Sequence, residues 1–144
     1  MAEFTFGMIK PDAVIAKNSG PIIKMLEDDG FNIVRMRKGV LSVDTAEQFY
    51  AVHKDKPFFK ELVEFVTSGP VIIMALHRDD AIKRLRELMG ATNPADAADG
   101  TVRKLYGTSI GSNAVHGSDA PETAIIELEL FFPELGTDGL KVEF

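Results

Sequence analysis

Short apolar runs separated by turn residues give the chain the pattern of a four-stranded sheet protein. Two of the runs are nearly continuous, which is typical of strands covered on both faces. A third alternates Val34, Met36 and Val40 with polar positions, which predicts a strand with one exposed face. The predicted strands are residues 4–9, 31–41, 71–76 and, as a short piece only, 114–115.

Helical spacing and helix-start residues predict helices between these strands. Asp44 and Glu47 fit a capping box at the start of one helix, and Asp79 is expected to cap another. Residues 90–112 are rich in Gly, Thr, Asn, Asp and Ser without a clear period, which predicts a long functional loop. The predicted helices lie within residues 12–29, 45–53, 57–66, 80–89 and 121–131, and the second and third form a hairpin.

This order of elements predicts a single α+β domain over residues 1–144. It is a split βαβ pattern with an insertion, as in ferredoxin-like sandwiches. The expected architecture is an antiparallel four-stranded sheet with helices on one face and an inserted helical hairpin. The other face is left for the hairpin, a ligand or a partner subunit. A length of 144 residues with 45% apolar residues suits one core of this kind.

The charge balance limits the partners of this domain. With 16 Lys and Arg residues against 22 Asp and Glu residues, the net charge is −6, which argues against nucleic acid or anionic lipid as a partner. An anionic substrate therefore needs positive side chains gathered at one site. The chain has no cysteine and no apolar run near the roughly 20 residues of a membrane span. We expect a cytoplasmic protein that does not enter membranes.

Several familiar catalytic motifs are absent from the sequence. It contains no P-loop, no dinucleotide-binding glycine motif, no His-Glu-x-x-His and no Gly-x-Ser-x-Gly elbow. His116, Ser118 and Asp119 have the composition of a hydrolase triad, but side chains so close in sequence do not easily converge. His116 taken alone is equally well explained as a half-buried structural histidine. His53 fits either a partner of a helix C-terminus or a phosphate contact.

Several stretches favour a functional role for His116, because together they resemble one enzyme family. The segment Asn113-Ala-Val-His116-Gly-Ser118-Asp119 closely resembles the active-site signature of nucleoside diphosphate kinases. Further stretches match the family in the same order, and the resemblance covers essentially the whole chain. They are Phe6-Gly-Met-Ile-Lys10-Pro-Asp12, His53-Lys-Asp-Lys-Pro-Phe58-Phe59, Ser68-Gly-Pro70, Arg86-Glu-Leu-Met-Gly-Ala-Thr92-Asn-Pro94 and Gly100-Thr-Val-Arg103.

The resemblance implies transfer of the terminal phosphate of a nucleoside triphosphate, typically ATP, to a nucleoside diphosphate. The transfer would follow a ping-pong mechanism through a phosphohistidine at His116, with Mg²⁺ held mainly by the nucleotide phosphates. A neutral imidazole nitrogen is a competent nucleophile, and two half-reactions let donor and acceptor use one site in turn. Low base specificity and a role in balancing nucleotide pools are also implied.

The resemblance also implies a group of residues around His116. Glu127 and Ser118 would orient the imidazole, and Tyr50 would support them. Asp119 would either approach Mg²⁺ through a water molecule or cap the last helix, and the cap is the favoured role. Gly117 would leave room for the transferred phosphate.

A nucleotide site built from distant residues is implied as well. Arginine offers paired donors to phosphate, and an aromatic face accepts any base by stacking. The phosphates would be held by Arg86, Thr92 and Arg103, the sugar by Lys10 and Asn113, and the base by Phe58, with Ile110 and His53 as further candidates.

The chain departs from the family at three places, and two other function classes are alternatives. Lys56 stands where arginine is expected, Arg103 is followed by Lys-Leu-Tyr-Gly-Thr-Ser where acidic residues are common, and the tail after Phe132 is idiosyncratic. These departures leave loop details, tail packing and subunit contacts open. Family members form hexamers or tetramers built from dimers, so we expect a homo-oligomer. A ferredoxin-like sheet also suits RNA binding, but this chain lacks the RNP1 pattern and is acidic. A regulatory homologue with an added binding role is the other alternative.

Replacing Arg103 with alanine is predicted to weaken nucleotide binding much more than replacing Arg37 with alanine. Arg103 belongs to the matching stretches and Arg37 does not. Loss of a charged hydrogen bond to phosphate corresponds to a roughly 10- to 100-fold rise in Kd. Isothermal titration with a nucleoside diphosphate measures the effect, and equal losses in the two variants would contradict the assignment.

Overall fold

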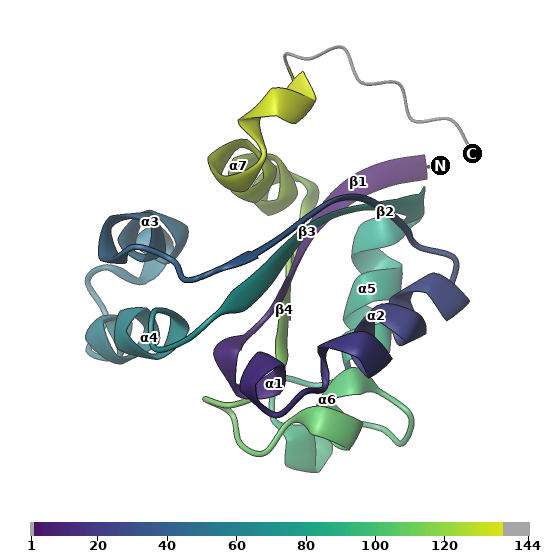
Figure 1. Cartoon of the computed structure of the whole chain (residues 1–144), viewed down its shortest axis with the longest axis horizontal. Helices are drawn as coiled ribbons and strands as arrows, with labels where there is room; N and C mark the ends of the chain where they lie inside the picture. The colour runs from purple at the N-terminus through teal and green to yellow at the C-terminus, as the bar shows by residue number, and fades with distance from the viewer. Residues whose placement is uncertain (1, 137–144) are drawn as a thin grey trace.

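The computed structural model describes residues 2–136, and its centre is a four-stranded antiparallel sheet (Figure 1). The strands lie in the order β2-β3-β1-β4, so β1 and β4, from opposite ends of the chain, are neighbours. In this pair, Met8 lies opposite His116. The strands are β1 (Ala2–Ile9), β2 (Asn32–Gly39), β3 (Val71–Asp79) and β4 (Val115–Gly117).

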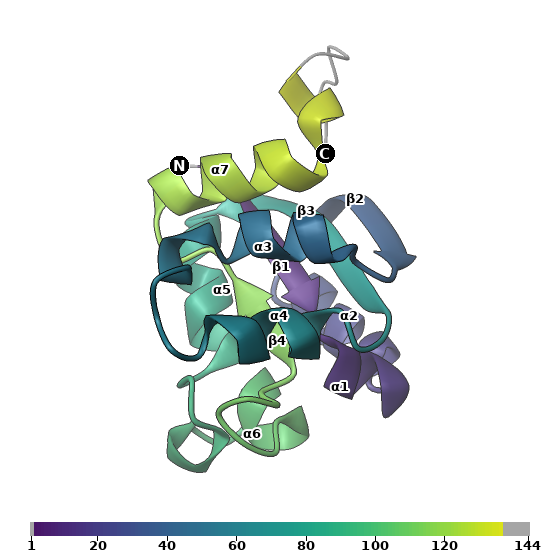
Figure 2. The same cartoon turned by 90° about the vertical axis from the view of Figure 1, so that its left-hand side faces the viewer.

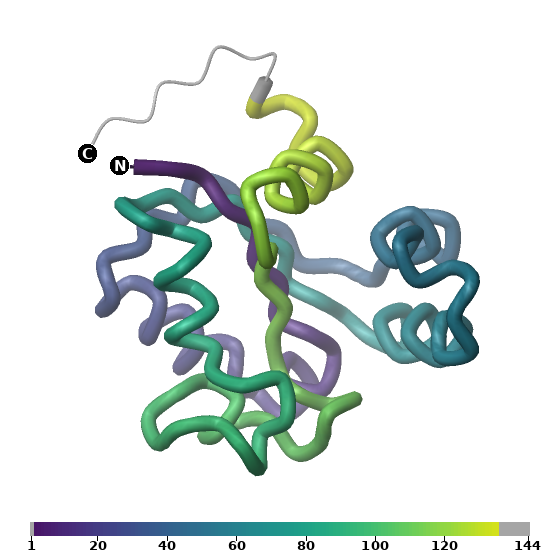
Figure 3. Tube along the Cα trace, turned by 180° about the vertical axis from the view of Figure 1, so that it is seen from behind, coloured from purple at the N-terminus to yellow at the C-terminus, as the bar shows by residue number. Residues whose placement is uncertain are grey.

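Helices cover both faces of the sheet (Figures 1 and 3). Successive residues of β1 point to opposite faces, so Ile9 belongs to one apolar core and Phe6 and Met8 to the other. The helices are α1 (Pro11–Ile15), α2 (Ser19–Asp28), α3 (Val43–Phe49), α4 (Phe59–Val66), α5 (Ala81–Met89), α6 (Val102–Tyr106) and α7 (Pro121–Phe131), with short 3₁₀ turns at Ala51–His53, Pro94–Asp96 and Pro133–Gly136.

The predicted ferredoxin-like class, the antiparallel sheet and the inserted hairpin are confirmed. The hairpin of α3 and α4 lies on the face opposite α2 and α5 (Figure 2). The structure adds α7 to the hairpin's face, where Phe131 stacks on Phe6 with ring centroids 4.8 Å apart. Burial of these rings explains why the last helix folds onto this face.

Residues 90–112 are not the continuous loop that the composition predicts. They contain α6 and a 3₁₀ turn, Pro94–Asp96. α6 has five residues, too few to display a helical period in the sequence. Its local signal is Thr101, whose Oγ1 accepts a hydrogen bond from the backbone N–H of Lys104 at 3.4 Å.

β2 lies at the edge of the sheet and does not keep the predicted alternation. Val34 is an extra residue between Ile33 and Arg35 in the pairing with β3. This bulge shifts the side on which later side chains lie. Met36 is 51% exposed and Val40 is 64% exposed, so the prediction that both face the core is wrong.

The cap of α3 also differs from the predicted capping box. Ser42 is the N-cap residue, and its Oγ accepts from the backbone N–H of Thr45 at 3.1 Å. Asp44 instead accepts a hydrogen bond from the side chain of Gln48 at 2.9 Å. Two neighbouring residues are good caps, and the backbone of Ser42, with a ψ of 156°, decides between them.

α5 is capped from another part of the chain. The predicted cap, Asp79, belongs to β3, and Asp80 at the N-cap position makes no side-chain hydrogen bond to the helix. Glu3, on β1, supplies the acceptor, and its Oε1 receives the backbone N–H of Ile82 at 3.0 Å. Sequence spacing cannot reveal a cap contributed by a residue so far away.

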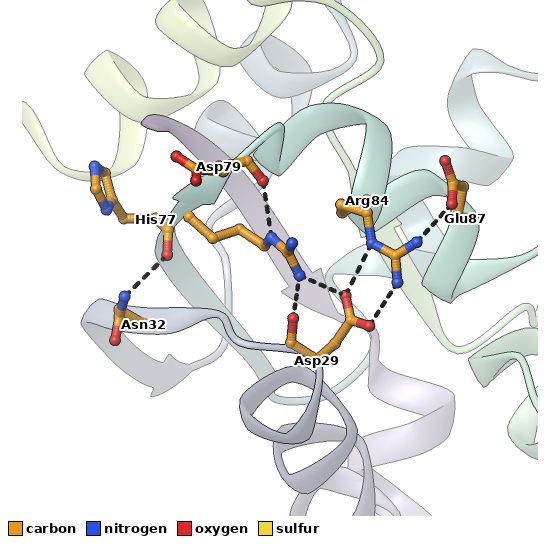
Figure 4. Close-up of polar contacts among 7 residues, drawn as sticks. Asp29, Asn32, His77, Asp79, Arg84 and Glu87 are labelled. Carbon is orange, nitrogen blue, oxygen red and sulfur yellow. Dashed lines mark hydrogen bonds and ion pairs between the residues drawn. The ribbon is translucent and has the colours of Figure 1, made fainter. Parts of the chain in front are cut away.

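An ion-pair network fixes α5 against α2 and β3 (Figure 4). The Asp29 carboxylate accepts hydrogen bonds from Nη2 of Arg84 at 2.6 Å and from Nη1 of Arg78 at 3.0 Å. Arg84 also contacts Glu87 at 2.7 Å. Because the Asp29 side chain is only 19% exposed, its charge depends on these partners.

Replacing Asp29 with alanine is predicted to lower the free energy of unfolding by about 2 kcal/mol, because the charged hydrogen bonds from two arginines to its carboxylate are lost. Urea denaturation measures this change. The neighbouring variant Asp28→Ala is the matched control, since the pair of Asp28 with Lys24 is exposed at 64% and 75% and is expected to contribute little. Equal destabilisation by both variants would show that the network has no special role.

Candidate active site

His116 lies in the middle of β4, where it is half-buried beside aromatic rings. Its ring meets that of Phe49 edge to face with centroids 4.8 Å apart. Its Nε2 lies 3.1 Å from each carboxylate oxygen of Glu127, on α7. An ionised carboxylate can only accept, so this contact assigns the proton to Nε2 and leaves Nδ1 with a free lone pair.

Glu127 is a buried carboxylate with two hydrogen-bond donors. It is 6% exposed, and Ser118 Oγ donates to its Oε1 at 2.7 Å. The hydroxyl and the His116 ring together satisfy the oxygens of a group that would be costly to bury alone. The predicted grouping of Glu127 and Ser118 around His116 is present, although sequence periodicity had given no sign of it.

Tyr50, the predicted support of this group, lies close to Glu127. It is 9% exposed and packs against Phe49 with ring centroids 4.8 Å apart. Burial raises the pKa of Tyr50 to about 12, and the negative charge of Glu127 contributes to the rise. The phenol therefore stays neutral beside the carboxylate.

A cavity of about 320 Å³ opens in front of His116. Three of its lining side chains carry positive charge and come from three elements or their ends, which gives an acidic chain a locally basic pocket. The acidic side chain at the cavity is Asp119. The cavity is lined by Lys10, Arg86, Met89, Gly90, Ala91, Thr92, Arg103, Asn113, His116, Gly117 and Asp119.

Lys10 and Asn113 form a connected polar pair in the cavity wall. Lys10 Nζ donates to Asn113 Oδ1 at 2.9 Å, and Asn113 Nδ2 donates to the carbonyl of Thr92 at 3.0 Å. Burial and, to a smaller extent, the charge of Arg103 lower the pKa of Lys10 to about 8, although the charge of Asp12 opposes the fall. A bound anion would relieve this strain on the ammonium.

Arg103 donates hydrogen bonds to the backbone around the cavity. Its Nη1 donates to the carbonyl of Gly90 and its Nη2 to the carbonyl of Val115, both at 3.0 Å. Burial lowers the pKa of its guanidinium, and the charge of Arg86 adds to the effect. Arg86 is exposed by contrast, so the two arginines differ in how much of their side chain is free for a ligand.

Gly117 has a second reason for being glycine, besides the one predicted. It lines the cavity, but a Cβ added there would lie 2.7 Å from Leu85 Cδ2 and 2.8 Å from Met89 Cε. The missing side chain lets α5 approach β4, so glycine has a packing role here in addition to the predicted role of leaving room for phosphate.

Asp119 does not cap α7 through the backbone. The N-cap residue is Ala120, without a side-chain cap, and Asp119 Oδ1 instead accepts from the hydroxyl of Thr123 at 2.8 Å. Pro121 at the first helical position lacks an N–H, so it leaves one donor fewer to cap. The favoured cap prediction is wrong, and Asp119 remains at the cavity.

Three of the predicted ligand contacts do not line this cavity. Phe58 is 42% exposed and Ile110 is 60% exposed, and the loop between α6 and β4 that carries Ile110 extends toward α4 (Figures 1 and 2). His53 lies beside Phe58, with ring centroids 5.5 Å apart. Conversely, sequence reasoning gave no role to Met89, Gly90 and Ala91, although they lie in a stretch that resembles the family.

Comparison with known proteins gives one consistent family. The sequence profile described as nucleoside diphosphate kinase matches residues 3–136. A nucleoside diphosphate kinase of Mesorhizobium japonicum is 56% identical over 132 residues, which are 92% of this chain and 94% of that protein. One of Persephonella marina is 51% identical over 133 residues, 92% of this chain and 95% of the relative.

Solved structures agree with the sequence relatives. The Aquifex aeolicus nucleoside diphosphate kinase is similar with a TM-score of 0.91 and 40% identity, covering 94% of this chain and 98% of that one. A halophilic nucleoside diphosphate kinase from Halobacterium salinarum, solved in complex with CDP, has a TM-score of 0.91 and 41% identity, covering 100% of this chain and 94% of the other.

Replacing Lys10 with methionine is predicted to change how stability depends on pH. Between pH 8 and 10.5 the unfolded chain keeps the Lys10 proton and the folded protein has lost it, so folding releases a proton and the unmodified protein gains stability as pH rises. Across this window its free energy of unfolding should rise by up to about 3 kcal/mol relative to Lys10→Met. Denaturant titrations from neutral to alkaline pH test this, and parallel profiles would contradict it.

Proposed function

The chain belongs to the nucleoside diphosphate kinase family, whose members transfer phosphate between nucleotides, and we propose that it does so through a phosphohistidine at His116. The observation that carries the proposal is the 3.1 Å contact of Nε2 with both Glu127 oxygens. Because this contact keeps the proton on Nε2, the lone pair of Nδ1 is the nucleophile. The basic cavity in front of His116 supports a polyphosphate as the ligand.

The reaction consists of two symmetric displacements. First, the Nδ1 lone pair forms a bond to the terminal phosphorus of a nucleoside triphosphate, and the bond to the bridging oxygen breaks with its electron pair leaving on the diphosphate. A second diphosphate then attacks this phosphorus through its terminal oxygen, and the P–N bond breaks. Phosphorylation at Nδ1 leaves Nε2 protonated, and Glu127 stabilises that form of the ring.

The positive side chains bind the phosphates and orient them for in-line attack. Arg86 and Thr92 contact them directly, and Arg103 combines this contact with its hydrogen bonds to the cavity wall. The Lys10–Asn113 pair contacts the sugar hydroxyls. CDP in the Halobacterium salinarum enzyme supports a nucleoside diphosphate as the ligand of this fold.

The base lies against Phe58 and Ile110, outside the enclosed part of the site. Both side chains are exposed, Phe58 by 42% and Ile110 by 60%, which supports stacking without hydrogen-bond readout. The enzyme therefore accepts any base and balances nucleotide pools. His53, beside Phe58, is a further contact for the nucleotide.

The donor set fits Mg²⁺ held mainly by the nucleotide. Within residues 2–136 no three His, Cys, Asp or Glu side chains gather closely enough to enclose a metal. Mg²⁺ commonly binds through substrate phosphates and few protein carboxylates, and Asp119 at the cavity is available through a water molecule. When bound, Mg²⁺ neutralises negative charge on the phosphates.

The proposal extends to the assembly of the enzyme and its location in the cell. β2 is an edge strand of the sheet and carries exposed Met36, which supports a homo-oligomer in the form of a hexamer or a tetramer of dimers. Residues 1–144 act as one domain in the cytoplasm. In the described part of the chain, no helix is long and apolar enough to cross a membrane.

Brief incubation with γ-labelled ATP and Mg²⁺ is predicted to label the protein. The label should be stable to alkali and labile to acid, as a phosphoramidate is, and should be absent from His116→Ala. His77→Ala is the matched control and should keep the label, since His77 lies on β3 and does not line the cavity. Unlabelled protein, or label that persists in His116→Ala, would falsify the mechanism.

A further inference from the structure

Ala114 is a fully buried residue in a backbone conformation that L-amino acids rarely adopt. Its φ is 74°, and Val115 N–H donates to the carbonyl of Asn113 at 2.9 Å across it. This i to i+2 hydrogen bond with positive φ belongs to a rare and strained kind of γ-turn. The left-handed region is unfavourable for a residue with a Cβ, so groups outside the turn must hold Ala114 in this conformation.

Residues between β1 and α1 hold Ala114 on both sides. Its N–H donates to Oδ2 of Asp12 at 3.0 Å, and its carbonyl accepts from the N–H of Lys10 at 2.8 Å. Pro11, which is fully buried, restricts the backbone between these two contacts. Oδ1 of Asp12 is buried and has no hydrogen-bond partner within residues 2–136. Among these residues, the carboxylate therefore accepts its hydrogen bond from Ala114 N–H through Oδ2.

The turn joins two groups that act on the nucleotide in the proposed function. Asn113 precedes Ala114 and is tied to Lys10 and to the carbonyl of Thr92, and His116 follows two residues later. A change of φ at Ala114 would rotate one group relative to the other. We propose that Asp12 is a positioning residue that holds Ala114 in the left-handed conformation and thereby aligns His116 with the cavity, an inference that rests on the proposed phosphohistidine function.

Asp12 also acts on Lys10 through its charge. Its negative charge also favours protonation of Lys10 and so raises the pKa of that ammonium. Asp12→Asn removes the charge but keeps an oxygen that can accept the Ala114 N–H, whereas Asp12→Ala removes both. The two substitutions therefore distinguish a role of the charge from a role of the hydrogen bond.

The test measures the single-turnover rate of His116 phosphorylation by ATP, with thermal unfolding recorded for each variant. Asp12→Ala should slow phosphorylation by about 10- to 100-fold, as expected for a displaced nucleophile, and Asp12→Asn by much less. Ala114→Gly added to Asp12→Ala should restore most of the rate, because glycine adopts positive φ without the Cβ cost. Lys17→Gly is the matched control, since exposed Lys17 also has positive φ, 66°, and should restore nothing.

Several results would overturn the proposal. They are an unchanged rate in Asp12→Ala, an equal loss in Asp12→Asn, and a lack of rescue by Ala114→Gly. If Asp12→Ala does not fold, Ala114→Gly but not Lys17→Gly should restore both a cooperative unfolding transition and labelling, and failure to do so also overturns the proposal. Failure of the unmodified protein to become labelled contradicts the phosphohistidine function itself, which distinguishes the two failures.

Discussion

The contact between His116 and Glu127 is the interaction on which the rest of the site depends. A carboxylate that is 6% exposed is stable only if its oxygens receive donors, and here the donors are an imidazole on β4 and the hydroxyl of Ser118. The same requirement fixes which imidazole nitrogen keeps its lone pair. The hydrogen bonds of Glu127 and the tautomer of His116 are therefore set by one arrangement, which requires α7 to pack against the sheet.

A second constraint is the repulsion among the basic side chains at the cavity. Lys10 is half-buried and Arg103 is buried, and a neighbouring positive charge contributes to the lowered pKa of each. Hydrogen bonds from Arg103 to Gly90 and Val115 hold its guanidinium in place despite this repulsion. A polyphosphate would supply the missing negative charge. In the proposed function, hydrogen bonds that already hold the basic groups in place would reduce the reorganisation needed during phosphate transfer.

Contacts between distant parts of the chain also fix the elements that carry the site. Glu3 of β1 caps α5, Asp29 holds α5 against α2, and Gly117 lets α5 approach β4 closely. At the other end of β1, Lys10 and Asp12 hold the turn at Ala114. Both ends of β1 therefore position neighbouring elements, which explains how a strand far from His116 in sequence belongs to the same functional unit.

The sequence by itself determined the strands, most of the helices and the fold class, because those depend on local apolar periodicity and turn residues. Its resemblance to one family also pointed to His116, to its contact Glu127 and to the basic residues that line one cavity in the structure. Tertiary structure alone decided the caps of α3 and α5, the bulge that exposes Met36, the packing role of Gly117 and the turn at Ala114. Most of these features arise from atoms of residues far apart in the chain, and even the choice of Ser42 over Asp44 depends on the backbone path. A local pattern contains no information about which distant group will fill a space or accept a hydrogen bond.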